Sequence, residues 1–186
     1  MSKAIGIRVK KADDGYDLGA SKFFGTPTVP EAWETDFSDT ALFFCQLRLA
    51  DIAALDTENR LPHTGYLYVF LDTADGAYRL KADVRYSPDE PRLAIEEFNS
   101  VTEGYERFSE AWLMEFFPTD EDADGTRLLG VPADWPYEEV PPVLLLQYDP
   151  LDNGMGFLDG LDGFLYLFFG EDAADFGAVT LHGEYS

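Results

Sequence analysis

The chain contains two closely similar stretches of aromatic and aliphatic residues, Gly65-Tyr66-Leu67-Tyr68-Val69-Phe70 and Gly163-Phe164-Leu165-Tyr166-Leu167-Phe168. Side chains alternate between the two faces of a β-strand, so the aromatic rings of each stretch share one face and its aliphatic groups share the other. Aromatic and β-branched residues favour strands over helices. Because neither face is polar, we predict two central strands that are each covered on both sides.

These stretches are the last of several landmarks that occur twice in the same order. Each series opens with a basic residue, two apolar residues, a glycine and a proline, in Lys22-Phe23-Phe24-Gly25-Thr26-Pro27 and in Arg127-Leu128-Leu129-Gly130-Val131-Pro132. A tryptophan and then an apolar run ending in glutamine follow, which gives Trp33 and Gln46 in the first series and Trp135 and Gln147 in the second. This order predicts an internal duplication.

The repeated landmarks define the expected domain organisation. We expect one compact domain over residues 1–186, with pseudo-repeats over about residues 20–75 and 127–175 and a connecting region over 76–126. The predicted class is α+β and mainly β, with two similar β-rich halves that bury their apolar faces against each other. The chain is 46% hydrophobic and 15% aromatic, which excludes intrinsic disorder.

Weaker patterns suggest further elements. Residues 5–9 alternate weakly and suggest an edge strand, residues 79–86 alternate more clearly, and residues 112–117 form an apolar strand that stops at Pro118. Helices are predicted over residues 51–55 and 91–98, the latter with a proline near its start. Residues 119–126 and 149–162 are rich in Gly and Asp and predict loops.

The charge balance is strongly acidic. Thirteen Lys and Arg residues face 36 Asp and Glu residues, for a net charge of -23. Nucleic acid and anionic membrane surfaces would repel such a protein, so neither is an expected partner. Three explanations stay open: adaptation to salt, general solubility, or a surface matched to a basic protein partner such as a toxin.

The ends and the single cysteine bear on the compartment. The N-terminal residues lack the apolar core of a secretory signal, and no apolar run is long enough to span a bilayer. One cysteine excludes an internal disulfide framework, and Cys45 lies in an apolar run where we expect a small buried side chain. We expect a cytoplasmic protein.

The combined landmarks resemble the YwqG-like family, a bacterial family of unknown function. The resemblance covers about residues 20–183 and is carried by Ser21-Lys22-Phe23-Phe24-Gly25-Thr26-Pro27, by Gln46, by Leu61-Pro62-His63-Thr64-Gly65, by Leu129-Gly130-Val131-Pro132 and by Leu145-Leu146-Gln147. The chain departs from the family pattern at Phe24, where the family has glycine, and at Asp162, which is shifted by one residue. The resemblance implies a mostly β fold of two similar halves, no established catalytic residues, and for some relatives a role in immunity against bacterial toxins.

Motifs for known catalytic chemistry are absent from the sequence. The two histidines, His63 and His182, are far apart, and the chain has no zinc, nucleophile-elbow or phosphate-loop motif. Asp120, Asp122 and Asp124 reproduce the first half of a calcium loop with Gly125 at its sixth position, but the twelfth position is Val131 instead of glutamate. This segment is therefore either a solvated acidic turn or a weak metal site, and no cofactor is predicted.

Four other residues are candidates for ligand binding: Gln46, Gln147, Trp33 and Trp135. A buried amide must find hydrogen-bond partners, so each glutamine either bonds to backbone of a loop or of the other half, or contacts a ligand. Each tryptophan either packs over the strands or lines a cleft shared by the halves.

These observations favour a non-catalytic cytoplasmic binding module, with an immunity-type role as one form, whose acidic surface engages a basic protein. The alternative is a small-ligand binder or hydrolase that uses a cleft between the two halves.

Overall fold

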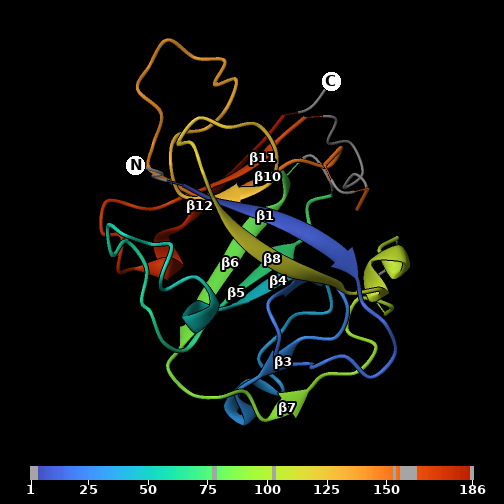
Figure 1. Cartoon of the computed structure of the whole chain (residues 1–186). Coiled ribbons are helices and arrows are strands. Elements are labelled where there is room, and N and C mark those ends of the chain that lie inside the picture. Colours follow the sequence, from blue (N-terminus) through green and yellow to red (C-terminus); the bar gives the residue numbers. More distant parts are fainter. Residues whose placement is uncertain (1–3, 77–78, 102–103, 153, 156–162, 185–186) are drawn as a thin grey trace.

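The structure is a computed structural model of the chain. It describes residues 4–76, 79–101, 104–152, 154–155 and 163–184. The protein is mainly β, with 35% of residues in strands and 8% in helical conformation. All paired strands are antiparallel in the described residues, and ten of them form a single sheet that is nearly closed (Figure 1). The strands of this sheet are β1 (Ala4–Lys11), β2 (Lys22–Phe23), β4 (Ala41–Arg48), β5 (Tyr66–Asp72), β6 (Lys81–Ser87), β8 (Trp112–Thr119), β9 (Arg127–Leu128), β10 (Leu144–Tyr148), β11 (Leu165–Phe168) and β12 (Thr180–Gly183).

The smaller elements lie outside this sheet. Strands β3 (Thr28–Val29) and β7 (Leu93–Ala94) pair with each other in a separate two-stranded sheet. The helices of the described residues are all short 3₁₀ helices: η1 (Glu31–Trp33), η2 (Leu49–Asp51), η4 (Glu106–Ser109) and η5 (Phe176–Ala178).

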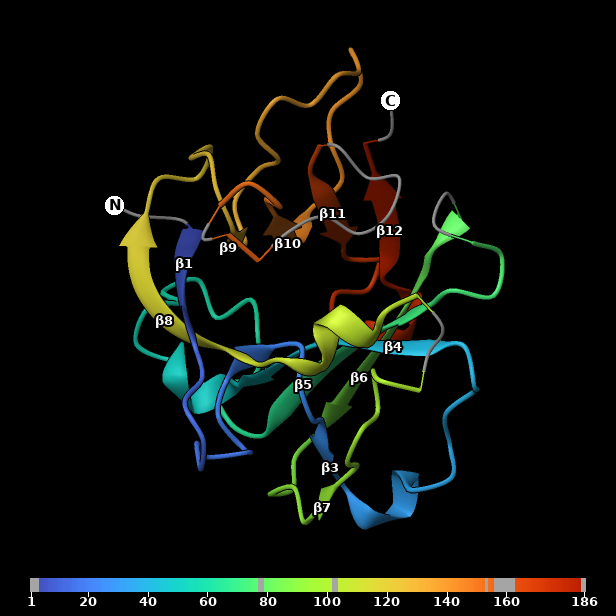
Figure 2. The same cartoon turned by 90° about the vertical axis from the view of Figure 1, so that its right-hand side faces the viewer.

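Strands β1 and β8 form the middle of the large sheet, whose order is β12-β11-β10-β9-β1-β8-β2-β4-β5-β6. They pair along their whole length, from Ala4 opposite Thr119 to Lys11 opposite Trp112. We call β2–β7 with their loops the first part of the chain, and β9–β12 with their loops the second part. Strand β1 precedes the first part but pairs with β9 of the second, and β8 precedes the second part but pairs with β2 of the first. Figure 2 shows β1 and β8 running side by side along one side of the molecule. The two parts of the chain are therefore joined through exchanged strands.

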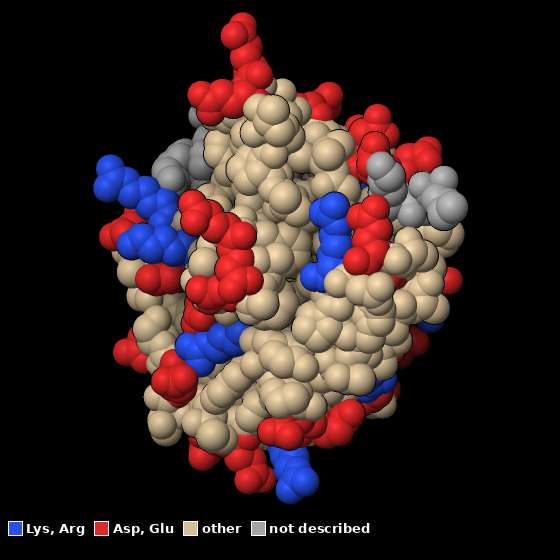
Figure 3. Space-filling model, turned by 90° about the vertical axis from the view of Figure 1, so that its left-hand side faces the viewer, with Lys and Arg blue, Asp and Glu red and all other residues tan. Residues whose placement is uncertain are grey.

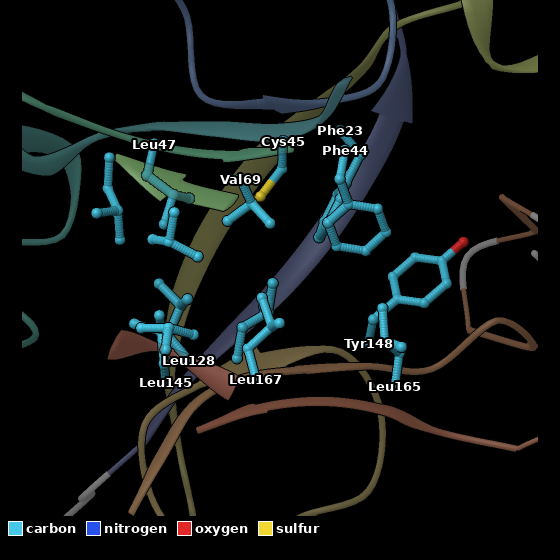
Figure 4. Close-up of a cluster of buried hydrophobic side chains, with 14 of the residues drawn as sticks. Phe23, Phe44, Cys45, Leu47, Val69, Leu128, Leu145, Tyr148, Leu165 and Leu167 are labelled. Atoms are coloured by element: carbon cyan, nitrogen blue, oxygen red, sulfur yellow. The ribbon is translucent and has the colours of Figure 1, made fainter. Parts of the chain in front are cut away.

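The hydrophobic core fills the space enclosed by the large sheet. Val69 of β5 points into it from one side, and Leu165 and Leu167 of β11 point into it from the other (Figure 4). Leu67 of β5 belongs to the same cluster. All four side chains are at most 1% exposed. Burial of apolar surface stabilises a folded protein by about 25 cal/mol per Å². The shared core is therefore the main source of stabilisation between the two parts of the chain.

A β-bulge places consecutive residues of an apolar run on the same side of the sheet. The register of β4 on β5 shifts between Phe43 and Cys45, and that of β10 on β11 shifts between Leu144 and Leu146. As a result, Phe44 and Cys45 both reach the central core while Phe43 packs on the outer face. A bulge of this kind re-aims the side chains that follow it, here the two glutamines.

The outer faces of β5 and β11 are also covered, as the sequence predicts. Five buried residues of the first part, Val29, Phe43, Tyr66, Tyr68 and Phe70, pack under Trp33, Phe37, Leu93, Ile95 and Phe98. The corresponding cluster in the second part is smaller and contains Leu144, Tyr166 and Phe168 under Trp135 and Phe164. Tyr68 and Tyr166 are both 0% exposed.

Several weaker sequence predictions are wrong. Residues 5–9 lie inside the sheet and not at its edge, because β8 and β9 flank β1 on both sides. Strand β8 continues through Pro118 to Thr119. Residues 91–98 contain β7 in place of a helix, because Arg92 and Ile95 donate backbone hydrogen bonds to Val29 and Pro27. The helix predicted over residues 51–55 is only the end of η2 followed by turns.

Two other predictions agree with the structure except at their boundaries. Residues 79–86 overlap β6, which begins at Lys81 and ends at Ser87, and residues 120–126 of the loop predicted over 119–126 lie outside strands, mostly in turns and bends. Residues 153 and 156–162 of the predicted loop over 149–162 lie outside the described residues.

Candidate functional site

Gln46 uses its side-chain amide to hold a loop of its own part of the chain. It lies opposite Tyr68 in the β4–β5 ladder and is 0% exposed. Its Oε1 accepts a hydrogen bond from the Thr28 amide at 3.0 Å, and its Nε2 donates to the carbonyls of Leu18 and Ala20, both at 3.0 Å. Both amide protons are therefore used by backbone, as in the non-ligand alternative for this residue.

Gln147 makes the same kind of contacts in the second part. It lies opposite Tyr166 in the β10–β11 ladder and is also 0% exposed. Its Oε1 accepts from the Ala133 amide at 2.9 Å, and its Nε2 donates to the Gly125 carbonyl at 2.8 Å. In the strand order, four strands separate the two glutamines, and each amide binds the loop beside its own strand. They do not converge on a common cleft.

Two buried cations accompany the glutamines and were not singled out as functional by the sequence. Lys22 pairs with Gln46 across β2 and β4, and Arg127 pairs with Gln147 across β9 and β10. The Lys22 ammonium donates to the Leu18 carbonyl at 2.6 Å, and the Arg127 guanidinium donates to the carbonyls of Ala123, Leu129 and Val131. The sequence feature that could have identified these two buried cations is the basic residue at the start of each repeated series.

Burial shifts the titration of both cations. Lys22 and Arg127 are each 0% exposed. Removal from water disfavours the charged form of a base. It therefore lowers the pKa of Lys22 to about 7 and that of Arg127 to about 10. Arg127 is bonded to three backbone carbonyls, and Lys22 is bonded to the Leu18 carbonyl and lies over the Tyr16 ring, so these contacts explain a structural role without any ligand.

The turn after each buried cation has an unusual backbone. Phe24 and Gly25 have φ values of 55° and 79°, and Leu129 and Gly130 have values of 63° and 85°. The Phe24 amide donates to the Phe44 carbonyl at 2.9 Å, and the Leu129 amide donates to the Leu145 carbonyl at 3.1 Å. Each turn thus bonds to the bulged residue of the adjacent strand.

Trp33 packs over the outer face of β5. Its ring lies edge-on to Tyr68 at a centroid distance of 5.3 Å. The guanidinium of Arg85 lies over the Trp33 ring at 5.4 Å and over the Phe37 ring at 4.7 Å. The Tyr68 hydroxyl is buried and has no hydrogen-bond partner among the described residues. Trp33 therefore belongs to a closed aromatic cluster.

Trp135 packs over β11 in a more open setting. Its ring lies edge-on to Tyr166 at 5.9 Å and to Phe168 at 5.3 Å, and it also contacts the ring of His182 at 5.5 Å. The ring of Tyr137 also lies edge-on to Trp135, at a centroid distance of 5.0 Å, and Tyr137 is 53% exposed. The buried Trp135 Nε1 has no hydrogen-bond partner among the residues that the structure describes. Trp33 and Trp135 are both half-buried, and Trp135 lies beside the exposed ring of Tyr137.

The acidic candidates for metal binding are exposed. Asp120, Asp122 and Asp124 lie in the turn before β9, where nearby carbonyls bind Arg127 and Gln147. In the described part of the chain, no group of three or more His, Cys, Asp or Glu side chains could hold a metal ion. His63 lies 3.3 Å from the buried carboxylate of Asp56, which otherwise accepts from the amides of Arg60 and Leu61.

The surface contains one pocket beside the Trp135 cluster. It has a volume of about 640 Å³ and is lined by Tyr137, His182 and Glu184 together with the apolar side chains of Leu80, Leu181 and Pro136. Leu80 precedes β6 and Leu181 belongs to β12, so the pocket lies where the two ends of the large sheet approach each other. A smaller pocket of about 180 Å³ lies between Arg60 and the Pro141–Val143 segment.

On one face of the molecule, acidic side chains are spread rather than gathered in a single patch (Figure 3). On the face drawn in Figure 3, they occur in several groups around a broad uncharged area and outnumber the basic side chains. No helix among the described residues is long and apolar enough to cross a membrane.

Comparison with protein-family models gives no match for this chain, and comparison with curated proteins gives none either.

Proposed function

We propose that the protein is a non-catalytic binding module whose acidic surface engages a basic protein. The observation that carries this proposal is the burial of scarce positive charge. Lys22 and Arg127 are enclosed in the fold and bonded to carbonyls, which leaves at most 11 of the 13 basic residues to offset 36 carboxylates. Excess charge of one sign steers a partner of opposite charge and accelerates its association.

The contacts of the candidate ligand residues also favour this function over the alternative of a ligand-binding or hydrolytic cleft. The side-chain amides of Gln46 and Gln147 form hydrogen bonds with loop backbone, and Trp33 is packed in an aromatic cluster. Such residues stabilise loops and are not available to a substrate. The proposal keeps the cytoplasmic location expected from the sequence and the immunity-type role implied by the resemblance to the YwqG-like family.

We further propose that the two parts of the chain arose by internal duplication. Support comes from hydrogen bonds that recur at corresponding positions. The Ile7 amide donates to the Thr126 carbonyl at 2.9 Å, and the Met114 amide donates to the Ser21 carbonyl at 3.0 Å. The amides of Gln46 and Gln147 each bind a loop in the same way, and both β-bulges fall at the same place in the apolar run.

The function is tested by association kinetics with a panel of small basic proteins and the same proteins after acetylation of their lysines. We expect saturable binding to at least one unmodified protein. Its association rate should fall at least tenfold when ionic strength rises from about 0.05 M to about 0.5 M. At the higher salt concentration the attraction between opposite charges extends only a few ångströms into solution, so it no longer steers the partner. Binding that is equal for acetylated and unmodified proteins, or no saturable binding to any of them, would reject the proposal.

A further inference from the structure

The pocket beside Trp135 has a counterpart in the first part of the chain that is already filled. There, Arg85 of β6 lies opposite Tyr68, and its guanidinium covers the rings of Trp33, Phe37 and Phe70 at 5.4, 4.7 and 5.9 Å. Asp83 and Asp36 hold this guanidinium, with N–O distances of 2.7 and 2.9 Å. The first part therefore fills its aromatic and acidic surface with an arginine of its own.

The second part has a histidine at the corresponding ladder position. His182 of β12 lies opposite Tyr166, and its ring contacts Trp135 at 5.5 Å and Tyr137 at 5.6 Å. Among the residues that the structure describes, those that line the adjoining pocket include no Lys or Arg. Within this described part of the chain, no Lys or Arg covers Trp135 as Arg85 covers Trp33.

The pocket also contains a carboxylate placed at its wall. Glu184 Oε2 accepts a hydrogen bond from the Phe164 amide at 2.9 Å, and Oε1 lies 3.5 Å from the Tyr166 hydroxyl. Each carboxylate oxygen can accept more than one hydrogen bond, so Glu184 keeps the capacity to bind a donor from outside. Glu138 and Glu139 are exposed next to Tyr137 and add negative charge.

We propose that this pocket binds an arginine side chain of a basic partner protein, with the guanidinium stacked on Tyr137 and hydrogen-bonded to Glu184. This inference rests on the proposed function and gives it a location. Guanidinium suits the site better than ammonium because it is planar, stacks on aromatic rings and pairs with carboxylate in a bidentate manner. The contacts of Arg85 in the first part show the same combination of rings and carboxylates within this chain.

The first test is an NMR titration of the whole protein with three peptides that differ only in one repeated residue: arginine, lysine or uncharged citrulline. We expect the arginine peptide to shift the signals of Trp135 Nε1–H and of the Leu181–Glu184 backbone, and to bind about fivefold more tightly than the lysine peptide. Shifts confined to other surfaces, or equal affinity for the lysine peptide, would overturn the inference.

Single variants measure the contribution of each wall of the pocket. Glu184→Gln keeps an oxygen for the Phe164 amide but removes the charge, and Tyr137→Ala removes the exposed ring. Each substitution should lower the affinity for the arginine peptide about fivefold. Glu171→Gln removes one exposed carboxylate near the opposite end of β11 and should change affinity less than twofold. Equal losses for Glu171→Gln and Glu184→Gln would reject the pocket.

The two proposals fail in different ways. If the basic proteins bind with strong salt dependence but Glu184→Gln and Tyr137→Ala have no effect, the binding function stands and the pocket assignment is wrong. If no basic protein binds in a saturable manner and the arginine peptide also fails to shift the Trp135 signal, both are wrong.

Discussion

Two glutamines show how a single polar side chain can organise a loop. Gln46 provides one acceptor and two donors to the backbone of residues 18–28, inside a site that water does not reach. A backbone group left buried without a partner costs about 1–3 kcal/mol. The amide therefore fixes a connection that has few regular hydrogen bonds of its own.

Replacing Gln46 by leucine tests this role. The change keeps the side chain's approximate size but removes the Gln46 partner of the Ala20 carbonyl and of the Thr28 amide, whereas the Leu18 carbonyl still accepts from the Lys22 ammonium. The free energy of unfolding should therefore fall by about 3 kcal/mol. Urea denaturation followed by tryptophan fluorescence measures the loss. Thr35→Ala, at an exposed position, should change stability by less than about 0.5 kcal/mol. A loss for Gln46→Leu as small as that control would contradict the assigned role.

The buried ammonium of Lys22 predicts a pH dependence of stability. Its pKa is about 7 in the folded protein and returns to the ordinary value of 10.5 on unfolding. Between these two values the unfolded state binds more protons, so the free energy of unfolding rises with pH, by at most about 1.4 kcal/mol per unit. Below pH 7 the lysine is charged in both the folded and the unfolded state, so it no longer makes the free energy of unfolding depend on pH.

Urea titrations of the wild type and Lys22→Met between pH 7 and about 9.5 should show the rise only in the wild type. The upper limit avoids the ionisation of tyrosines near pH 10. A direct NMR titration of the Lys22 Nζ in the wild type checks the same claim without a variant, and a midpoint near 10.5 would refute it.

At the scale of elements, the turn after each short strand depends on glycine for two separate reasons. Gly25 has a φ of 79°, and a Cβ there would lie 2.6 Å from the Ala111 Cβ. Gly15 has the same φ, but no heavy atom lies within 4 Å of its hypothetical Cβ. The pair therefore separates the backbone cost of a positive φ from the cost of a steric clash.

We expect Gly15→Ala to lower the free energy of unfolding by about 1 kcal/mol, through backbone strain alone. Gly25→Ala should lower it by at least about 3 kcal/mol, because β8 must move away from the turn. Thermal unfolding of both variants gives the comparison, and equal losses would show that the turn relaxes without displacing Ala111.

The sequence predicted those elements whose side chains carry a clear period, and it failed where long-range pairing decides the structure. The alternation around Tyr68 and Tyr166 is sufficient to identify buried strands, because both faces are apolar. The weak alternation of residues 5–9 suggests an edge strand, but β8 and β9 flank this strand. Residues 91–98 resemble a helix locally, but Arg92 and Ile95 bond to the β3 segment instead. Tertiary contacts override local preference in both cases.

The candidate site was predicted only in part. Glutamines at the ends of apolar runs identified the buried amides, and the doubled tryptophans identified both aromatic clusters. The pocket lined by Tyr137 and Glu184 could not be predicted, because it lies at the junction between the two ends of the sheet and no local sequence pattern indicates that junction.

At the scale of the whole molecule, the net charge of -23 opposes the compact state. Self-repulsion among carboxylates weakens with ionic strength, since the screening length falls from about 10 Å at 0.1 M to about 3 Å at 1 M. We therefore expect the melting temperature to rise by several degrees between about 0.05 M and 1 M NaCl. Differential scanning calorimetry measures it, and a neutral osmolyte at matched osmolality serves as the control. A melting temperature independent of salt would show that repulsion is already balanced in the fold.

The exchange of β1 and β8 has a consequence for how the chain is made. Both neighbours of β1 lie beyond residue 111, so a ribosome must release most of the polypeptide before the first strand can find either of them. Until then, the nascent N-terminal portion presents an incomplete sheet with unsatisfied strand edges, the kind of surface that recruits chaperones or aggregates. A fragment truncated before Trp112 should accordingly be insoluble when expressed alone and be rescued when the remaining residues are supplied as a separate polypeptide.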